Sequence, residues 1–368
     1  MTQQATFLGL VDRVRTSTIG LDIGGRVFRA AQGTLRGGAW RMARTARIER
    51  AIPLDGSPWR EPDLSELERL AGTLARRGFE GECVQIAVPR SMLMMQTLEL
   101  PPRASGAPVE KLARIELARA HRLMPDEIEC ATWDVPASSR GGDLTHVVAC
   151  GMRRADGERI AAAFADAGLS IVGIDMRSWA MARGAGVLSG ASGVARALID
   201  VAWDACTLAV SHRGVLVFER SVEDGALRNL YAGVAERLKI GIDVVEAAFD
   251  QGLWSDRAPS RDEAMLVQRE CRQSLTTYFD TMVPEVARSL QYAANRYASP
   301  IADLTLTGEG ATIPGLAPRL RQQLGIDGAG IGAWAPDHGP GVDGGPDLAC
   351  AIGLAMAGRG SGRIRRAA

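Results

Sequence analysis

Two aspartates, Asp22 and Asp200, each lie near the end of an apolar run and directly before a turn of small residues. The first run reads TIGLDIGG and the second reads ALIDVAWDA. A carboxylate inside an apolar strand is costly unless it is paired or holds a cation. Two interpretations follow: a hairpin whose aspartate caps its own turn, or a loop whose backbone N–H groups bind phosphate while the aspartate holds a hydrated divalent cation.

The elements that would position these aspartates occur twice in the chain. Residues 17–49 alternate between strand-like runs and tight turns, and residues 195–222 repeat the order of strand, turn, strand, turn, strand. Such a repeat indicates an internally duplicated fold. Two turns that face each other across a cleft could hold the phosphates of one nucleotide from opposite sides, which favours the second interpretation.

A third glycine-rich corner follows the second repeat. Residues 303–325 read as a short strand, a corner at Gly308 and Gly310, and an amphipathic helix from about Pro314. Glycines at such a corner let a ligand approach the backbone closely, as a nucleoside would. A simple junction between strand and helix remains the alternative interpretation.

Chain length and composition predict a globular protein with more than one lobe. At 368 residues the chain exceeds the size at which a single core keeps growing. Positive and negative charges balance at 43 each, so no nucleic-acid partner is expected. The six cysteines form no C-x-x-C pair and the four histidines are dispersed, which predicts neither a zinc nor a redox site. No apolar run is long enough to span a bilayer and no signal peptide is evident, so we expect a cytoplasmic protein.

The chain divides into six expected parts. They are an N-terminal lead segment (1–17), a first lobe (18–190) with an inserted subdomain at about 91–172, a second lobe (195–330), a Gly/Pro-rich loop (331–345), a helix that returns to the first lobe (346–358) and a basic tail (359–368). The lead segment or the tail could contact an anionic membrane surface. The alternative is a frayed helix and a solvated tail.

Several motifs, in order along the chain, resemble the actin-like ATPase superfamily, and within it the PilM family of the FtsA/PilM branch. They are the two hairpins, VQIAVPRSMLMMQTLELPP, EKLARIELARAHRLMPDEI, ADAGLSIVGIDMRSWAMARG, EVARSLQYAANRY and LACAIGLAMAG. The resemblance implies an α/β, actin-like (ribonuclease H-like) fold of two lobes, with a small α+β subdomain inserted in the first lobe.

The resemblance also implies a nucleotide site for ATP with Mg²⁺. The residues that match its motifs are Asp22, Gly24, Gly25, Arg29, Asp200, Thr207, Gly308 and Gly310, with Asp22 and Asp200 expected to hold Mg²⁺ through water. The phosphate loops depart from the family pattern. Ala202 stands where the family has glycine and lacks its freedom at positive φ, Trp203 is bulky for a phosphate approach, and Glu309 adds a negative charge to the third corner. We expect at most a weak ATPase, and no catalytic residue is assigned.

The implied function is a scaffold at the cytoplasmic face of the inner membrane in type IV pilus assembly. Family members bind the N-terminal peptide of a PilN-like single-pass protein in a groove beside the insert, and ATP could modulate that affinity through lobe closure. Self-association is a further expectation. The alternatives are a small-molecule kinase of the sugar or acetate kinase type, or an FtsA-like or type II secretion L-like protein. The shorter chain, with no terminal linker or membrane helix, favours the PilM family.

Overall fold

The protein is described here by a computed structural model, which places residues 15–36, 39–50, 60–136, 144–188, 193–250, 262–325, 331–333, 342 and 344–357. Most of the N-terminal lead segment, most of the Gly/Pro-rich loop and the basic tail lie outside these residues. The expectations for those three segments therefore stay predictions.

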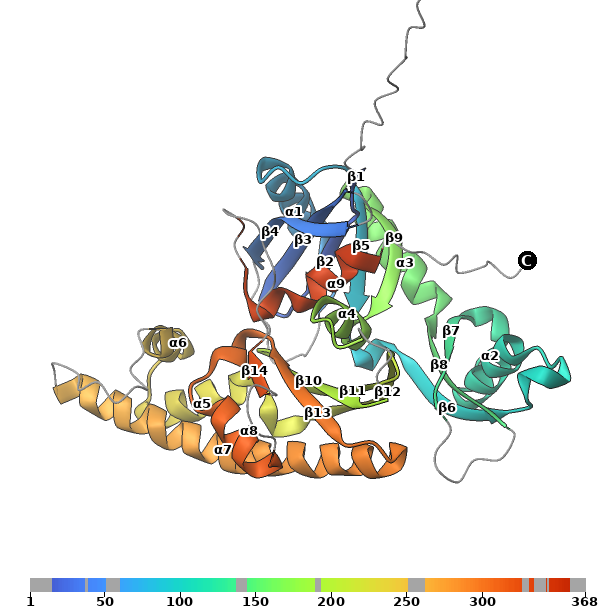
Figure 1. Cartoon of the computed structure of the whole chain (residues 1–368). Coiled ribbons are helices and arrows are strands. Elements are labelled where there is room, and N and C mark those ends of the chain that lie inside the picture. The colour runs from blue at the N-terminus through green and yellow to red at the C-terminus, as the bar shows by residue number, and fades with distance from the viewer. Residues whose placement is uncertain are drawn as a thin grey trace, which may run out of the picture.

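The first lobe is built on a six-stranded sheet (Figure 1). Its strands are β1 (Arg15–Thr16), β2 (Ile19–Ile23), β3 (Val27–Arg36), β4 (Ala39–Glu49), β5 (Cys83–Val88) and β9 (Ser170–Met176). Strands β2, β3 and β4 form an antiparallel meander, whereas β5 and β9 add to β2 in parallel. The short β1 pairs with the far end of β3.

The second lobe repeats this arrangement. Its strands are β10 (Ala195–Val201), β11 (Cys206–His212), β12 (Val215–Val222), β13 (Ile301–Thr307) and β14 (Ile331–Ala333). The meander β10–β11–β12 is antiparallel, and β13 and β14 add to β10 in parallel. The predicted duplication is confirmed, because each strand of this sheet has a counterpart in the first sheet with the same pairing direction.

Two short helices lie between the sheets, α4 (Arg177–Gly184) and α9 (Ala349–Ala357) (Figure 1). They cross closely because the contact positions are glycines: a Cβ on Gly184 would lie 2.0 Å from the Ala349 carbonyl oxygen, and one on Gly353 would lie 1.7 Å from that of Ala180. Helix α9 packs on β2 and β3 of the first lobe.

Strand alternation decides which side chains of the central strands face these helices. On β2, Leu21 and Ile23 enter a core shared with α1 (Leu64–Arg76) and α3 (Arg154–Asp166). Neighbouring positions point to the opposite face of the sheet, so Gly20 lies against α9 and Asp22 faces α4. This alternation explains a buried aspartate in an apolar strand.

Helices cover the face of the second sheet that points away from the first lobe (Figure 1). They are α5 (Leu227–Leu238), α6 (Ile242–Asp250), α7 (Asp262–Tyr297) and α8 (Leu316–Leu324). In α8, Leu316 and Leu320 are buried, as the amphipathic pattern predicts. No helix within the described ranges is long and apolar enough to cross a membrane.

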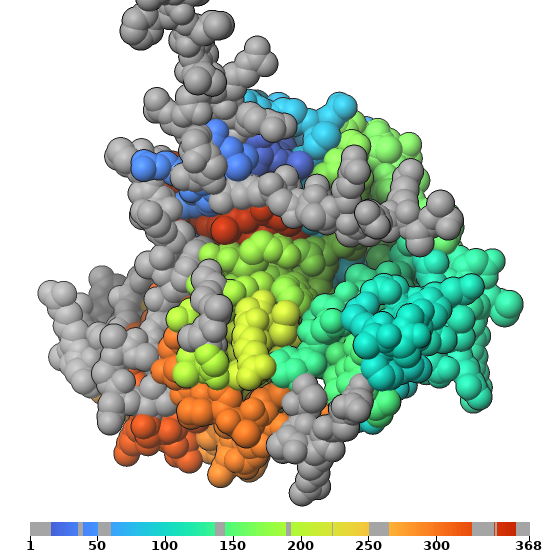
Figure 2. Space-filling view, turned by 45° about the vertical axis from the view of Figure 1, so that its right-hand side comes forward, coloured from blue at the N-terminus to red at the C-terminus, as the bar shows by residue number. Residues whose placement is uncertain are grey.

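The insert is a small α+β unit that projects beside both lobes (Figure 2). It contains β6 (Met94–Leu100), α2 (Val109–Ala120), β7 (Ile128–Asp134) and β8 (Thr145–Arg153), with β8 in the centre of its sheet. The predicted bounds of the insert, about 91–172, include helix α3. Its Ile160 and Phe164 instead pack into the core of the first lobe, because α3 returns against β9 and α1.

Candidate functional site

The two aspartates predicted to face each other both contact one arginine, Arg177, the first residue of α4. The Arg177 guanidinium donates through Nε to Asp22 Oδ1 at 3.1 Å and through a terminal nitrogen to Asp22 Oδ2 at 3.2 Å. Its other terminal nitrogen donates to Asp200 Oδ2. The side chains of Asp22 and Asp200 are 1% and 2% exposed. The structure thus brings the hairpins together and places a cation between them.

Further contacts hold both carboxylates. Burial alone would raise the pKa of Asp22, but the charge and hydrogen bonds of Arg177 outweigh it, and the pKa lies below its ordinary value. The nearby positive charge of Arg29 also lowers the pKa of Asp22. The Thr307 hydroxyl donates to Asp200 Oδ1 at 3.1 Å. Both aspartates are therefore held by groups of the protein itself.

The hairpins that carry these aspartates share one geometry. In each hairpin, the N–H two residues after the aspartate donates to the carbonyl five residues after it. Gly24 N–H donates to the Val27 carbonyl at 3.1 Å, and Ala202 N–H donates to the Ala205 carbonyl at 2.9 Å. In register, Asp22 pairs with Arg29 and Asp200 with Thr207. The two sheets therefore present equivalent positions to the space between the lobes.

The expectation that Ala202 deprives the second turn of a needed positive φ is wrong. Neither Gly24, Gly25 nor Ala202 has a positive φ. Gly24 is required for space instead, because a Cβ there would lie 2.7 Å from the Val27 carbonyl oxygen and from an Arg29 nitrogen.

Arg29 reaches acidic groups from two other segments. It donates through Nε to Asp347 Oδ2 at 3.1 Å and through a terminal nitrogen to Glu309 Oε1. Glu309 in turn accepts at 2.9 Å from the backbone N–H of Trp203 in the second hairpin. One carboxylate thus bridges the cation of the first hairpin and a turn N–H of the second.

The third corner packs against protein. Gly308 has a φ of +82°, and a Cβ there would lie 2.4 Å from the Val201 carbonyl oxygen. A Cβ on Gly310 would lie 2.3 Å from a Val201 methyl group. The glycines predicted to admit a ligand instead let the corner approach the end of β10 closely.

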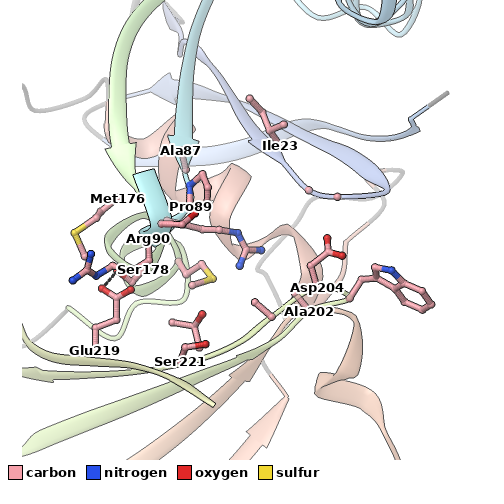
Figure 3. A pocket seen from close by; sticks show the side chains of 18 of the residues that line it. Ile23, Ala87, Pro89, Arg90, Met176, Ser178, Ala202, Asp204, Glu219 and Ser221 are labelled. Atoms are coloured by element: carbon pink, nitrogen blue, oxygen red, sulfur yellow. Dashed lines mark hydrogen bonds between the residues drawn. The ribbon is translucent and has the colours of Figure 1, made fainter. Parts of the chain in front are cut away.

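A cavity of about 560 Å³ lies between the lobes beside these contacts. Figure 3 shows Ile23, Ala87 and Pro89 of the first lobe facing Asp204 and Glu219 of the second.

Two carboxyls that line this cavity titrate abnormally. Burial, with the nearby Glu309 charge, raises the pKa of Asp204 to about 6. Burial also raises the pKa of Glu219, which accepts from the Ser178 hydroxyl at 3.0 Å. The interior of the cavity therefore holds two weakly acidic carboxyls.

The residues expected to hold ATP with Mg²⁺ are brought together, but their charged groups contact one another. Arg177 neutralises both expected metal ligands, and acidic side chains engage Arg29 and Trp203 N–H. No cluster of three or more His, Cys, Asp or Glu suited to a metal occurs in the described part of the chain. This donor set does not fit a hydrated Mg²⁺ ion with a polyphosphate.

Arg177 and Asp347 are not among the residues that the sequence motifs predict for the site. A cation in the first turn of a helix opposes the helix macrodipole, and this was the one local signal available for Arg177. Asp347 carries no comparable signal, because its partners Arg29 and Arg47 lie about 300 residues away in sequence.

A second hollow, of about 570 Å³, lies between the insert and the first lobe. Its walls come from β7 and β8 of the insert and from α3, β9 and α4 of the first lobe. Trp133 and Trp179 meet there edge to face, with ring centroids 5.4 Å apart. We call this hollow the insert groove.

The duplicated sheets, the helices between them and the shared cleft define an actin-like protein, which confirms the predicted fold class. Among solved structures, one described as a "PilM-PilN type IV pilus biogenesis complex" matches with a TM-score of 0.70 and 18% identity, over 94% of this chain and 99% of that one. The ethanolamine utilization protein EutJ of Carboxydothermus hydrogenoformans matches with a TM-score of 0.52 and 14% identity, over 93% of this chain and 89% of that one. MreB 5 of Spiroplasma citri, bound to AMPPNP, matches with a TM-score of 0.51 and 13% identity, over 93% of this chain and 95% of that one.

The family with the description "Type IV pilus assembly protein PilM" matches residues 20–333. The chain belongs to this family, as its motifs predict.

Proposed function

We propose that this protein is a PilM-type scaffold of a type IV pilus assembly platform, and that its insert groove binds the N-terminal peptide of a PilN-like membrane protein. Family membership supports the pilus role. The similar structure described as a PilM–PilN complex supports the class of partner. The observation that carries the choice of site is the groove between the insert and the first lobe.

The groove suits an extended peptide. Strands β7 and β9 both contribute to its walls, and each ends its sheet within the described residues, so backbone groups along either strand could pair with an added strand. The interior offers Ile174 and two tryptophans for apolar side chains.

Charges of both signs surround the groove, and they give a bound peptide orientation as well as affinity. On the insert side, Arg154 pairs with Glu129 at 3.1 Å. On the side of the first lobe, Arg183 pairs with Asp175 at 3.0 Å. We expect a short segment with alternating apolar side chains and a few charges to bind best.

Neighbouring alanines on α3 offer a matched test. Ala161 lines the groove, whereas Ala162 is exposed on the same helix and does not. We expect the N-terminal peptide of a PilN-like protein to bind in calorimetry, Ala161→Arg to weaken binding at least tenfold, and Ala162→Arg to leave it unchanged.

Two results would overturn the proposal. The first is an absence of heat at high micromolar peptide with the folded wild type. The second is equal loss of binding in both arginine variants, because a groove site requires that they differ.

Location at the cytoplasmic face of the inner membrane, self-association and contact with lipid belong to the same proposal. Light scattering across a range of protein concentrations tests self-association. Co-sedimentation with anionic vesicles tests contact with lipid. ATP with Mg²⁺ is not made part of the mechanism, because the contacts in the cleft do not fit it.

A further inference from the structure

We propose that side chains of this protein take the places that a divalent cation and nucleotide phosphates would occupy between the lobes, so that the cleft is closed by internal ion pairs without a ligand. Arg177 takes the place of the cation, and Glu309 takes the place of a phosphate group. This proposal is independent of the peptide site.

Arg177 performs the bridging that a metal ion would perform. A guanidinium is planar and permanently charged, and it can engage one carboxylate with two nitrogens while a third reaches another. Arg177 does so with Asp22 of the first lobe and Asp200 of the second. A cation entering between these carboxylates would have to displace Arg177, and the displaced guanidinium would be left in a buried position.

The turn of the second hairpin meets a carboxylate where a phosphate oxygen would be bound. In the second hairpin, Trp203 N–H donates to Glu309 Oε2 at 2.9 Å. Asp204 of the second hairpin lines the same cavity as Gly24 and Gly25 of the first. Turn N–H groups are the donors that would bind a phosphate, and here the N–H of Trp203 already has an internal acceptor.

Arg29 completes the anionic side. Its side chain is 6% exposed and is shared by Glu309 and Asp347. Burial by itself would lower the pKa of Arg29. The nearby negative charges outweigh burial, so the pKa of Arg29 lies above its ordinary value. An incoming phosphate would meet two carboxylates and would have to separate them from this arginine.

The rim of the cleft carries a further bridge between the lobes. Arg26 of the first hairpin donates to both oxygens of Glu246 on α6, at 3.1 and 2.8 Å. The guanidinium also lies over the Trp203 ring, 4.2 Å from its centroid. Trp203, which is too bulky for a phosphate loop, therefore helps to join the two hairpins.

Two measurements test the proposal together: a thermal-shift titration, and the distance between the lobes followed by energy transfer between two fluorescent labels. Label sites are Ser65→Cys on α1 and Gln322→Cys on α8, both exposed, in a Cys83→Ser background. We expect about 5 mM Mg·ATP or EDTA to change the unfolding midpoint of the wild type by less than about 1 °C. Energy transfer between the labels should be equally insensitive to both additions.

Variants on α4 separate closure from stability. Arg177→Ala removes the bridge between the lobes, so we expect lower energy transfer and a lower midpoint. Arg183→Ala is the matched control, because Arg183 contacts Asp175 and the Gly353 carbonyl within the first lobe. It should lower the midpoint without changing energy transfer. If Arg177→Ala does not fold, Glu309→Gln should show the same loss of energy transfer.

The proposal is overturned if Mg·ATP raises the wild-type midpoint by about 3 °C or more and Asp22→Asn abolishes that rise. It is also overturned if energy transfer in the folded Arg177 or Glu309 variant equals that of the wild type.

Discussion

The first hairpin and the second hairpin have the same backbone and different chemistry. Both place an aspartate at the strand end and close the same turn two residues later. The first then offers Arg29 and the second Thr207 at the equivalent register position. Asp22 is held by two nitrogens of Arg177, whereas Asp200 receives one of its nitrogens and the Thr307 hydroxyl. Duplication therefore fixed the positions, and the partners supplied by other segments determine what each position does.

The largest expected effect is on the charge shared by both hairpins. Arg177→Met removes the ion-pair partner that the buried Asp22 and Asp200 share, so we expect the free energy of unfolding to fall by about 3–5 kcal/mol in urea denaturation. Adding Asp22→Asn and Asp200→Asn should recover part of this loss, since no buried charge remains. A triple variant less stable than the single one would contradict the bridging role.

Glu309 links the cation of the first hairpin to the turn of the second. Glu309→Ala leaves Trp203 N–H and part of Arg29 without an acceptor, and we expect a loss of about 2 kcal/mol in the same measurement. The matched control is Asp280→Ala, which breaks an exposed pair with Arg319 and should cost about 0–1 kcal/mol. Equal losses would show that the bridge adds nothing to the folded state.

The two turns differ in how much room they leave. Gly24→Ala brings a Cβ to within 2.7 Å of the Val27 carbonyl oxygen, so we expect a loss of about 1–3 kcal/mol. Ala202→Gly only adds freedom to the unfolded chain and should cost about 0.5 kcal/mol. Urea denaturation of both variants checks this asymmetry, and equal costs would mean that the turns are equally crowded.

The smallest expected effect depends on pH. Burial raises the pKa of Asp204 to about 6, above its ordinary value, so its ionised form weakens the folded state. The stability that protonation provides is present at low pH and is lost as the pH rises toward 6. Asp204→Asn should therefore match the wild type near pH 4 and exceed its unfolding free energy by about 1 kcal/mol above pH 7, after allowance for partial exposure. A difference that stays constant with pH would contradict the shift.

Local patterns predicted most of the fold. The spacing of Asp22 and Asp200 from their turns, the amphipathic run at Leu316 and the apolar return helix all specify strands or helices by themselves, because periodicity is a property of the local chain. The place of α3 was not predictable in this way. Its apolar face fits either the insert or the first lobe, and only the packing of Phe164 decides.

The sequence by itself determined that two acidic hairpins, a third corner and an insert occur in the order of the PilM family, and alternation along β2 and β10 determined that both aspartates leave the apolar cores. Only the tertiary structure decided what meets them. Arg177 lies 155 residues from Asp22, and Glu309 lies 280 residues from Arg29. Side chains so far apart in sequence become partners through the packing of whole lobes. No local pattern encodes that pairing, so charges that read as a nucleotide site in sequence form an ion-paired bridge in the folded chain.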